Sequence, residues 1–118
     1  MSLIDMYAGA KYGPMNPAAF NAAAGAATKW KINVPSELKL GLFILRGTQP
    51  VRIRQGGVGI TAATATNATY LGPGVHYPML VEGPEDCYIS ILGGTTVAGN
   101  LEISIGNNVQ SWTLDGPL

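Results

Sequence analysis

The sequence predicts an all-β protein: a single β-sandwich or jelly-roll-like Greek-key body, preceded by a mostly irregular N-terminal arm with at most one short helix. From residue 28 onward, short apolar segments are separated by Gly, Pro and Asn at roughly the 8–12-residue spacing typical of sandwiches and barrels. The chain has 118 residues, which suits one domain and is too short for two. We therefore expect an extended arm at residues 1–27 and a β-sandwich domain at residues 28–118.

The arm contains five Gly and Pro residues that interrupt regular structure, and its apolar residues follow neither a strand period nor a sustained helix period. One short helix is expected within residues 16–25, because Asn16 can cap it, Pro17 suits its first position and Gly25 can end it. Two helical turns are not stable alone in water. The helix therefore needs a surface to pack on.

The first strand of the body is expected at residues 29–34, where Trp30 and Ile32 face inward and Lys29 and Lys31 face outward. Eight or nine short strands are expected in all. The others are placed at residues 38–47, 50–55, 66–72, 75–81, 87–92, 100–106 and 109–114, with a glycine-rich segment suited to a bulge at 56–62.

Three of these strands carry further information. Residues 38–47 end in a continuous apolar run, which indicates a central strand covered on both faces. In residues 50–55, Arg52 and Arg54 alternate with inward valine and isoleucine. Pro78 places its strand at a sheet edge or at a bulge, because proline cannot donate a ladder hydrogen bond.

The charge pattern indicates that neighbouring molecules cover part of the surface of this protein. Charged residues make up only 12 % of the chain, about half of the usual ~25 %, as is common where neighbours cover the surface. All seven cations precede residue 60 with two carboxylates, a net of +5; the remainder has five carboxylates and no cation, a net of −5. The cations are dispersed and lack an aromatic stacking platform, which argues against nucleic-acid binding. A dipolar subunit that docks on complementary neighbours fits this pattern.

Compartment signals are sparse. Cys87 is the only cysteine, so no internal disulfide is expected. The chain opens without a secretory signal pattern, and no apolar run reaches the ~20 residues of a membrane span. We expect a protein that is made in a cytoplasm and does not enter a membrane.

The sequence offers no catalytic or metal-binding motif. The single histidine, His76, has neither a nucleophile elbow nor a second base. Cys87 alternates with isoleucines and is expected to be a buried hydrophobe. Glu82, Glu85 and Asp86 fall short of a calcium loop and are expected in a solvated turn. We therefore expect no enzyme activity, no cofactor and no metal.

Aromatic residues have two interpretations. Trp30 and Trp112 are expected in the core. A sugar-stacking face could be formed by Tyr70, Tyr77 and Tyr88. Tyrosine is also an ordinary strand residue, and the interpretation as ordinary strand residues is favoured.

The sequence of the arm indicates that it needs a partner, because ordering it in water costs more conformational entropy than burial of its few large apolar side chains returns. Strand addition or groove docking on another protein satisfies it, and the alternative is that it wraps its own sandwich. Partner contacts are expected from Met6, Tyr7, Tyr12, Met15, Phe20, Lys29, Lys31, Arg52 and Arg54.

The apolar arm, the low-charge β body and the segment DCYISILGGTTVAGNLEISIG resemble small structural proteins of tailed-bacteriophage virions, most nearly the capsid decoration (cement) class. The resemblance implies a subunit present in many copies, often trimeric, on the capsid exterior, with its arm on the major capsid protein.

Three function classes follow. The first is a non-enzymatic virion protein that decorates or cements a phage capsid by bridging capsid subunits through its arm. The second is a ligand-binding β-module, either lectin-like or the receptor-binding tip of a tail. The third is an enzyme such as a cupin-like barrel, which one histidine does not support.

Overall fold

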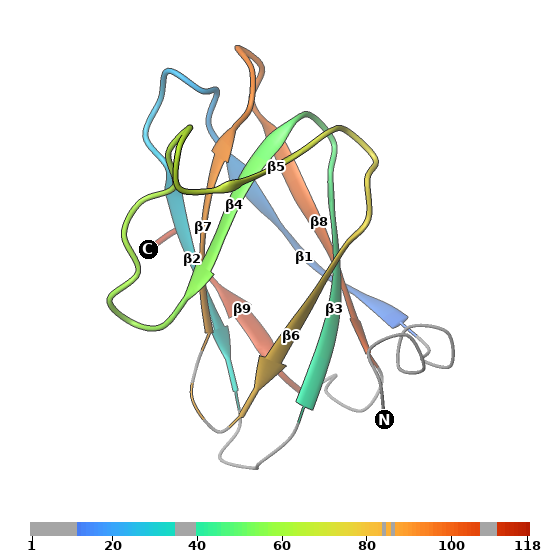
Figure 1. Ribbon diagram of the computed structural model, residues 1–118. Helices are drawn as coiled ribbons and strands as arrows, with labels where there is room; N and C mark the ends of the chain where they lie inside the picture. The colour runs from blue at the N-terminus through green and yellow to red at the C-terminus, as the bar shows by residue number, and fades with distance from the viewer. Residues whose placement is uncertain (1–11, 35–39, 84, 86, 107–110) are drawn as a thin grey trace.

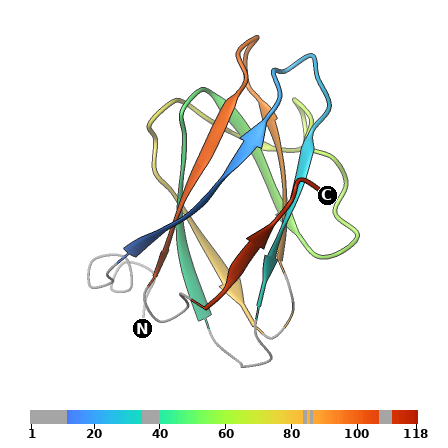
Figure 2. The same cartoon turned by 180° about the vertical axis from the view of Figure 1, so that it is seen from behind.

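The computed structural model describes residues 12–34, 40–83, 85, 87–106 and 111–118. Nine strands form two antiparallel sheets that pack face to face as a sandwich, and no helix occurs in the described residues (Figures 1 and 2). The strands are β1 (Tyr12–Phe20), β2 (Thr28–Asn33), β3 (Leu40–Gly47), β4 (Val51–Gly56), β5 (Thr69–Leu71), β6 (Tyr77–Glu82), β7 (Cys87–Gly93), β8 (Gly99–Gly106) and β9 (Thr113–Asp115). The expected all-β sandwich is confirmed. None of the described residues lies in a helix long and apolar enough to span a membrane.

The strand order is that of a jelly roll. The four-stranded sheet runs β1-β8-β3-β6 and the five-stranded sheet runs β5-β4-β7-β2-β9. Within these sheets β1 pairs with β8, β2 with β7, β3 with β6 and β4 with β5, so the chain is one antiparallel ribbon folded across the two sheets. The short strand β9 adds to the edge of β2.

The core lies between the sheets and follows the alternation of the strands. Phe43 and Leu45 of β3 meet Ile89 and Ile91 of β7 in one cluster, and all four are fully buried. Both tryptophans belong to this cluster, as expected. The Trp112 ring lies 5.8 Å from that of Phe43, centroid to centroid. It also packs on Gly41, where a Cβ atom would lie 2.6 Å from the indole.

Strand β1 corrects the expectation for the arm. Residues 12–20 form an edge strand antiparallel to β8 instead of a helix within residues 16–25, and Phe20 is only 2 % exposed. The two prolines allow this, since a proline is tolerated on an edge strand and Pro17 falls where the register shifts between Met15 and Ala18. From residue 12, the arm is therefore part of the sandwich.

The expectations for β3 and β6 are confirmed. Pro78 lies in β6, which is an edge strand. On β3, Leu42 and Ile44 point away from the core cluster yet are only 2 % and 8 % exposed, so the strand is covered on both faces. Apolar side chains of β3 are therefore buried on the outer face of the four-stranded sheet as well as in the core.

Candidate functional site

The outer face of the four-stranded sheet is unusually apolar. On β3 and β6 the cross-strand register places Leu42 beside Leu80 and Ile44 beside Pro78. The outer face of an antiparallel sheet is normally polar, because it meets water. Leu80 is 37 % exposed, so part of this apolar surface is open. Exposed apolar side chains that lie together on one face, here Leu80 and Pro78, are typical of an interaction site.

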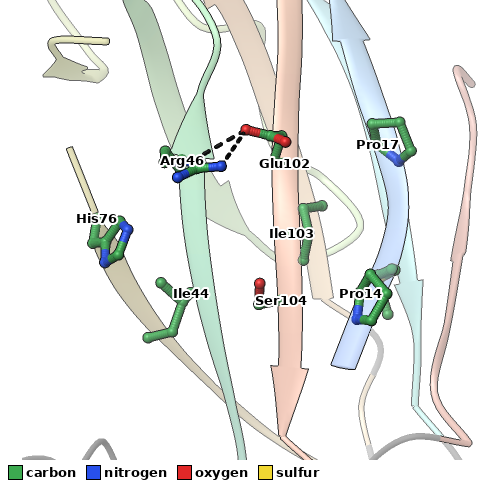
Figure 3. A pocket seen from close by; sticks show the side chains of 9 residues that line it. Pro14, Pro17, Ile44, Arg46, His76, Glu102, Ile103 and Ser104 are labelled. Atoms are coloured by element: carbon green, nitrogen blue, oxygen red, sulfur yellow. Dashed lines mark hydrogen bonds and ion pairs between the residues drawn. The ribbon is translucent and has the colours of Figure 1, made fainter. Parts of the chain in front are cut away.

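A groove of about 490 Å³ lies on this face (Figure 3). Ile44 and Ser104 lie along β3 and β8, Pro14 and Pro17 flank the groove on β1, and His76 lies on the opposite side. Strands β1, β3 and β8 are neighbours in the sheet although they are far apart in sequence. The complete lining is Pro14, Met15, Pro17, Ile44, Arg46, His76, Glu102, Ile103 and Ser104.

An ion pair crosses the groove between β3 and β8. Arg46 and Glu102 lie directly opposite each other in the register. Glu102 Oε1 accepts hydrogen bonds from Arg46 Nε at 3.1 Å and from Arg46 Nη2 at 2.9 Å (Figure 3). Both side chains are about half exposed, at 47 % and 48 %, so the pair adds little stability. Its main consequence is that the groove presents polar groups without a net charge from this pair.

The irregularity in β1 shapes one side of the groove. Between Met15 and Ala18 the register with β8 shifts, so two residues of β1, Asn16 and Pro17, stand opposite one residue of β8. Met15 is half-buried, packs against the core cluster and also lines the groove. Its expected role as a partner contact is therefore compatible with its position.

The other expected contacts of the arm have different outcomes. Met6 and Tyr7 lie outside the described residues. Tyr12 begins β1. Phe20 is buried in the core, so the expectation that it contacts a partner is wrong. Its inward position follows from the β1 register, which sets Phe20 opposite Gly99 on the face that packs against the other sheet.

The expected basic contacts lie on the outer face of the five-stranded sheet, where they hold a loop of the same chain. Loop 57–68 joins β4 to β5. Lys29 Nζ donates to the carbonyl of Val58 at 3.1 Å. Arg52 Nη1 donates to the Ala65 carbonyl at 3.2 Å, and Arg54 Nη1 to the Asn67 carbonyl at 3.1 Å.

Two of these cations also lie over tyrosine rings. Lys29 Nζ is 5.0 Å from the centroid of Tyr88, and the Arg52 guanidinium carbon is 5.1 Å from that of Tyr70. Lys31, on the same face, is half-buried and also has an interaction partner. The cations are thus engaged within the subunit, and their expected contacts with a partner stay a prediction.

Loop 57–68 was not foreseen, because its halves were interpreted as a bulged segment at 56–62 and a strand at 66–72. The Ala63 amide donates to Ser90 Oγ at 2.9 Å, and both residues are buried. Asn67 closes the loop: its Oδ1 accepts from the Thr64 amide at 2.7 Å and its Nδ2 donates to the Ala62 carbonyl at 3.0 Å. A signal was available, since asparagine among small residues favours such a local turn over a strand.

The remaining chemistry-bearing side chains do not converge. Cys87 is buried, and burial raises the pKa of its thiol, partly offset by a hydrogen bond with Gln55. Among the described residues there is no group of three His, Cys, Asp or Glu side chains able to hold a metal ion. Tyr77 lies on the four-stranded sheet, whereas Tyr70 and Tyr88 lie on the other sheet. The three tyrosines therefore form no common sugar-stacking face.

Comparison with known protein families, with curated proteins and with solved structures found no match to this chain.

Proposed function

We propose that this protein is a non-enzymatic virion structural protein that decorates or cements a bacteriophage capsid from the outside. The observation that carries the proposal is the apolar outer face of the four-stranded sheet, with its groove. Jelly rolls occur in capsid proteins and lectins alike, so the strand order alone does not select the function. The face supports the proposal, because its exposed leucines offer apolar surface to a neighbouring protein.

The chemistry of the face suits a protein partner. Leu80 and Leu40 are 37 % and 39 % exposed at one end of the face. Burying what remains exposed contributes only a part of the about 1.5–3 kcal/mol that full burial of such a side chain provides. The groove on the same face receives a projecting segment of the partner between β1 and β3. The paired charges of Arg46 and Glu102 fix the orientation of that segment without demanding an oppositely charged partner.

The edges of the sheets favour docking on a face over strand addition. In the four-stranded sheet, the edge strand β1 carries Pro14 and Pro17, and the opposite edge strand β6 carries Pro78. The edge strands β5 and β9 of the other sheet are three residues long each. Prolines and short edge strands both protect an edge from pairing with another chain. Contact through the apolar face then holds adjacent capsid subunits together against the pressure of packaged DNA.

The proposal is tested first on purified particles. Electron microscopy of virions made with and without the protein is expected to show added density on the capsid exterior only when the protein is present. Capsids that lack the protein are then incubated with the wild type or with Leu80→Glu and sedimented. Leu80→Glu is expected to reduce co-sedimentation at least tenfold, because it buries a carboxylate in the contact.

The matched control is Val58→Glu, which places the same charge on a valine that is 76 % exposed in loop 57–68. This variant is expected to co-sediment like the wild type, and thermal unfolding checks that both variants fold. Equal binding by Leu80→Glu and the wild type would contradict the proposed docking face. Absence of the protein from purified virions would contradict the function itself.

The groove also favours a second candidate, a ligand-binding β-module that takes a sugar. Its volume falls within the ~300–1,000 Å³ range of small-molecule sites. Arg46, Glu102 and Ser104 offer hydrogen-bonding groups suited to hydroxyls. A glycan array followed by thermal shift tests it: a sugar that raises the melting temperature of the wild type but not of Ser104→Trp supports this candidate.

A further inference from the structure

The ion pair in the groove leaves hydrogen-bonding capacity unused. Glu102 accepts both hydrogen bonds through Oε1, and Arg46 donates them through Nε and Nη2 (Figure 3). In the described part of the chain, Glu102 Oε2 and Arg46 Nη1 have no hydrogen-bond partner. Two residues that lie directly opposite each other on β3 and β8 therefore present both an acceptor and N–H donors to a ligand.

A hydroxyl and apolar side chains surround this pair. The register sets Ser104 of β8 opposite Ile44 of β3 on one side and opposite Pro14 of β1 on the other. Ser104 lies two residues from Glu102, so the two side chains share the outer face of the sheet. All of these residues line the groove, and Ser104 is half-buried. The groove thus combines three polar groups with apolar walls.

Docking of a partner changes the surroundings of these polar groups. In the free subunit water reaches them, since the side chains of Arg46 and Glu102 are about half exposed. The proposed function, on which this inference rests, places a segment of the partner in the groove and removes that water. A donor or acceptor of a charged group that is buried without a partner destabilises a complex strongly. A well-matched segment therefore supplies an acceptor for Arg46 and a donor for Glu102.

This requirement excludes charged side chains in the groove. An acidic side chain accepts from Arg46 but is repelled by Glu102, and a basic side chain meets the opposite conflict. The group that fits both residues is uncharged and carries a donor together with an acceptor.

Two uncharged alternatives fit less well. A Ser or Thr hydroxyl both donates and accepts, but so short a side chain leaves most of a groove of about 490 Å³ unfilled. A sugar offers hydroxyls, but no residue that lines the groove is Phe, Tyr or Trp, so its ring has no aromatic side chain to stack on. A primary amide meets the requirement, because it carries a carbonyl acceptor and two N–H donors on one planar group.

We propose that the groove recognises the side-chain carboxamide of a Gln or Asn residue on the docked protein segment. The carboxamide oxygen accepts from Arg46 Nη1, and its NH₂ group donates to Glu102 Oε2 and to Ser104 Oγ. The methylene groups of the same side chain pack on Pro14 and Ile44.

Selection of peptides tests this inference. A random heptapeptide library displayed on phage is selected on the immobilised full chain, and we expect enrichment of peptides with Gln or Asn at one position. The most enriched peptide is then synthesised with the carboxamide and with the corresponding carboxylate, and calorimetry measures both dissociation constants. The wild type is expected to bind the carboxamide peptide at least about tenfold more tightly, because only the carboxamide donates to Glu102.

A single substitution is expected to reverse this preference. Glu102→Gln keeps an oxygen that accepts from Arg46 and replaces Oε2 by an N–H donor. This variant is expected to bind the carboxylate peptide more tightly than the carboxamide peptide, which a purely structural role of Glu102 would not produce. Glu82→Gln makes the same change at an exposed residue of β6 outside the groove lining and is expected to keep the wild-type preference. Thermal unfolding checks that both variants fold.

The inference is overturned if the library yields no enrichment, or if acidic, basic or hydroxyl side chains are enriched instead. An unchanged preference of Glu102→Gln overturns it as well, and so does a sugar that displaces the selected peptide from the wild type. The peptide experiments use no capsid, so the two proposals fail separately. Absence of the protein from virions contradicts the capsid function, whereas binding to capsids without a carboxamide preference contradicts only the recognition proposed here.

Discussion

At the scale of single residues, Cys87 gives a pH-dependent prediction. Burial raises the pKa of its thiol above the usual value of 9.0, with the hydrogen bond of Gln55 acting in the opposite direction. Because the unfolded chain releases this proton at lower pH than the folded chain, the thiol's contribution to stability is fully present below the unfolded pKa. It is lost as the pH rises through the folded pKa.

Urea unfolding at pH 7 and at pH 10 measures this effect. The free energy of unfolding is expected to fall more steeply with pH for the wild type than for Cys87→Ala, which lacks the titrating thiol. The comparison between the two proteins removes the contributions of Tyr and Lys residues that titrate in both. Identical slopes would show that the thiol is solvated in the folded protein.

Residue-level prediction from the sequence succeeded where alternation was clean. Cys87 alternates with two isoleucines, and it is buried as expected. Trp30 alternates with Ile32 on β2 and is in the core for the same reason, whereas Trp112, also in the core as expected, lies just before β9. The prediction failed for Phe20, because the residues before it contain two prolines and show no period of two. A β-bulge shifts the alternation by one residue, which hides a strand from any test of simple periodicity.

At the scale of elements, the strong strands from β2 to β8 were predictable within a few residues, because hydrophobic alternation and turn residues mark them directly. Loop 57–68 was not, because Ala, Thr and Gly give little signal for either a strand or a loop. What orders this loop is a set of contacts with Lys29 of β2 and with Arg52 and Arg54 of β4, each 13 or more residues away in the sequence. Those contacts are tertiary, so local sequence cannot reveal them.

The loop's hydrogen bonds give a prediction for hydrogen exchange. Arg54→Met removes the donor that holds the Asn67 carbonyl while keeping an apolar stem of similar length. A hydrogen bond to a charged group contributes about 1.5–3 kcal/mol, so the amides of residues 57–68 are expected to exchange at least about tenfold faster. Mass spectrometry of the peptides from this loop measures the change.

The control for this experiment is Arg46→Met, which removes a half-exposed ion pair from the opposite sheet. It is expected to leave exchange in loop 57–68 unchanged, because its partner Glu102 lies on β8. If Arg54→Met also left exchange unchanged, the remaining contacts of the loop would be enough to hold it without Arg54.

At the scale of the whole molecule, the fold class was predictable and the groove was not. The number and spacing of short strands indicate a sandwich before any pairing is known. The groove requires β1, β8 and β3 to lie side by side, a juxtaposition set by long-range pairing. The apolar outer face could be predicted in part. Residues 38–47 end in a continuous apolar run, which indicated a strand covered on both of its faces.

The pairing of β1 with β8 makes the N-terminal strand essential for folding. Deletion of residues 1–27 removes β1 and with it Ala18 and Phe20 from the core, and it exposes the edge of β8. The deletion is therefore expected to abolish cooperative unfolding or to lower the melting temperature sharply. Deletion of residues 1–11 keeps β1 and is expected to leave a cooperatively folded sandwich, as circular dichroism during heating can check.

A point substitution separates loss of packing from loss of the strand. Phe20→Ala keeps the β1 backbone but empties a buried aromatic site, and such changes typically cost about 3–5 kcal/mol. Its melting temperature is expected to lie between those of the wild type and the 1–27 deletion. A 1–27 deletion that melts like the wild type would mean that β1 is dispensable. Docking of the arm on another protein would then be possible, because residues 12–20 would be free to leave the sheet for a partner.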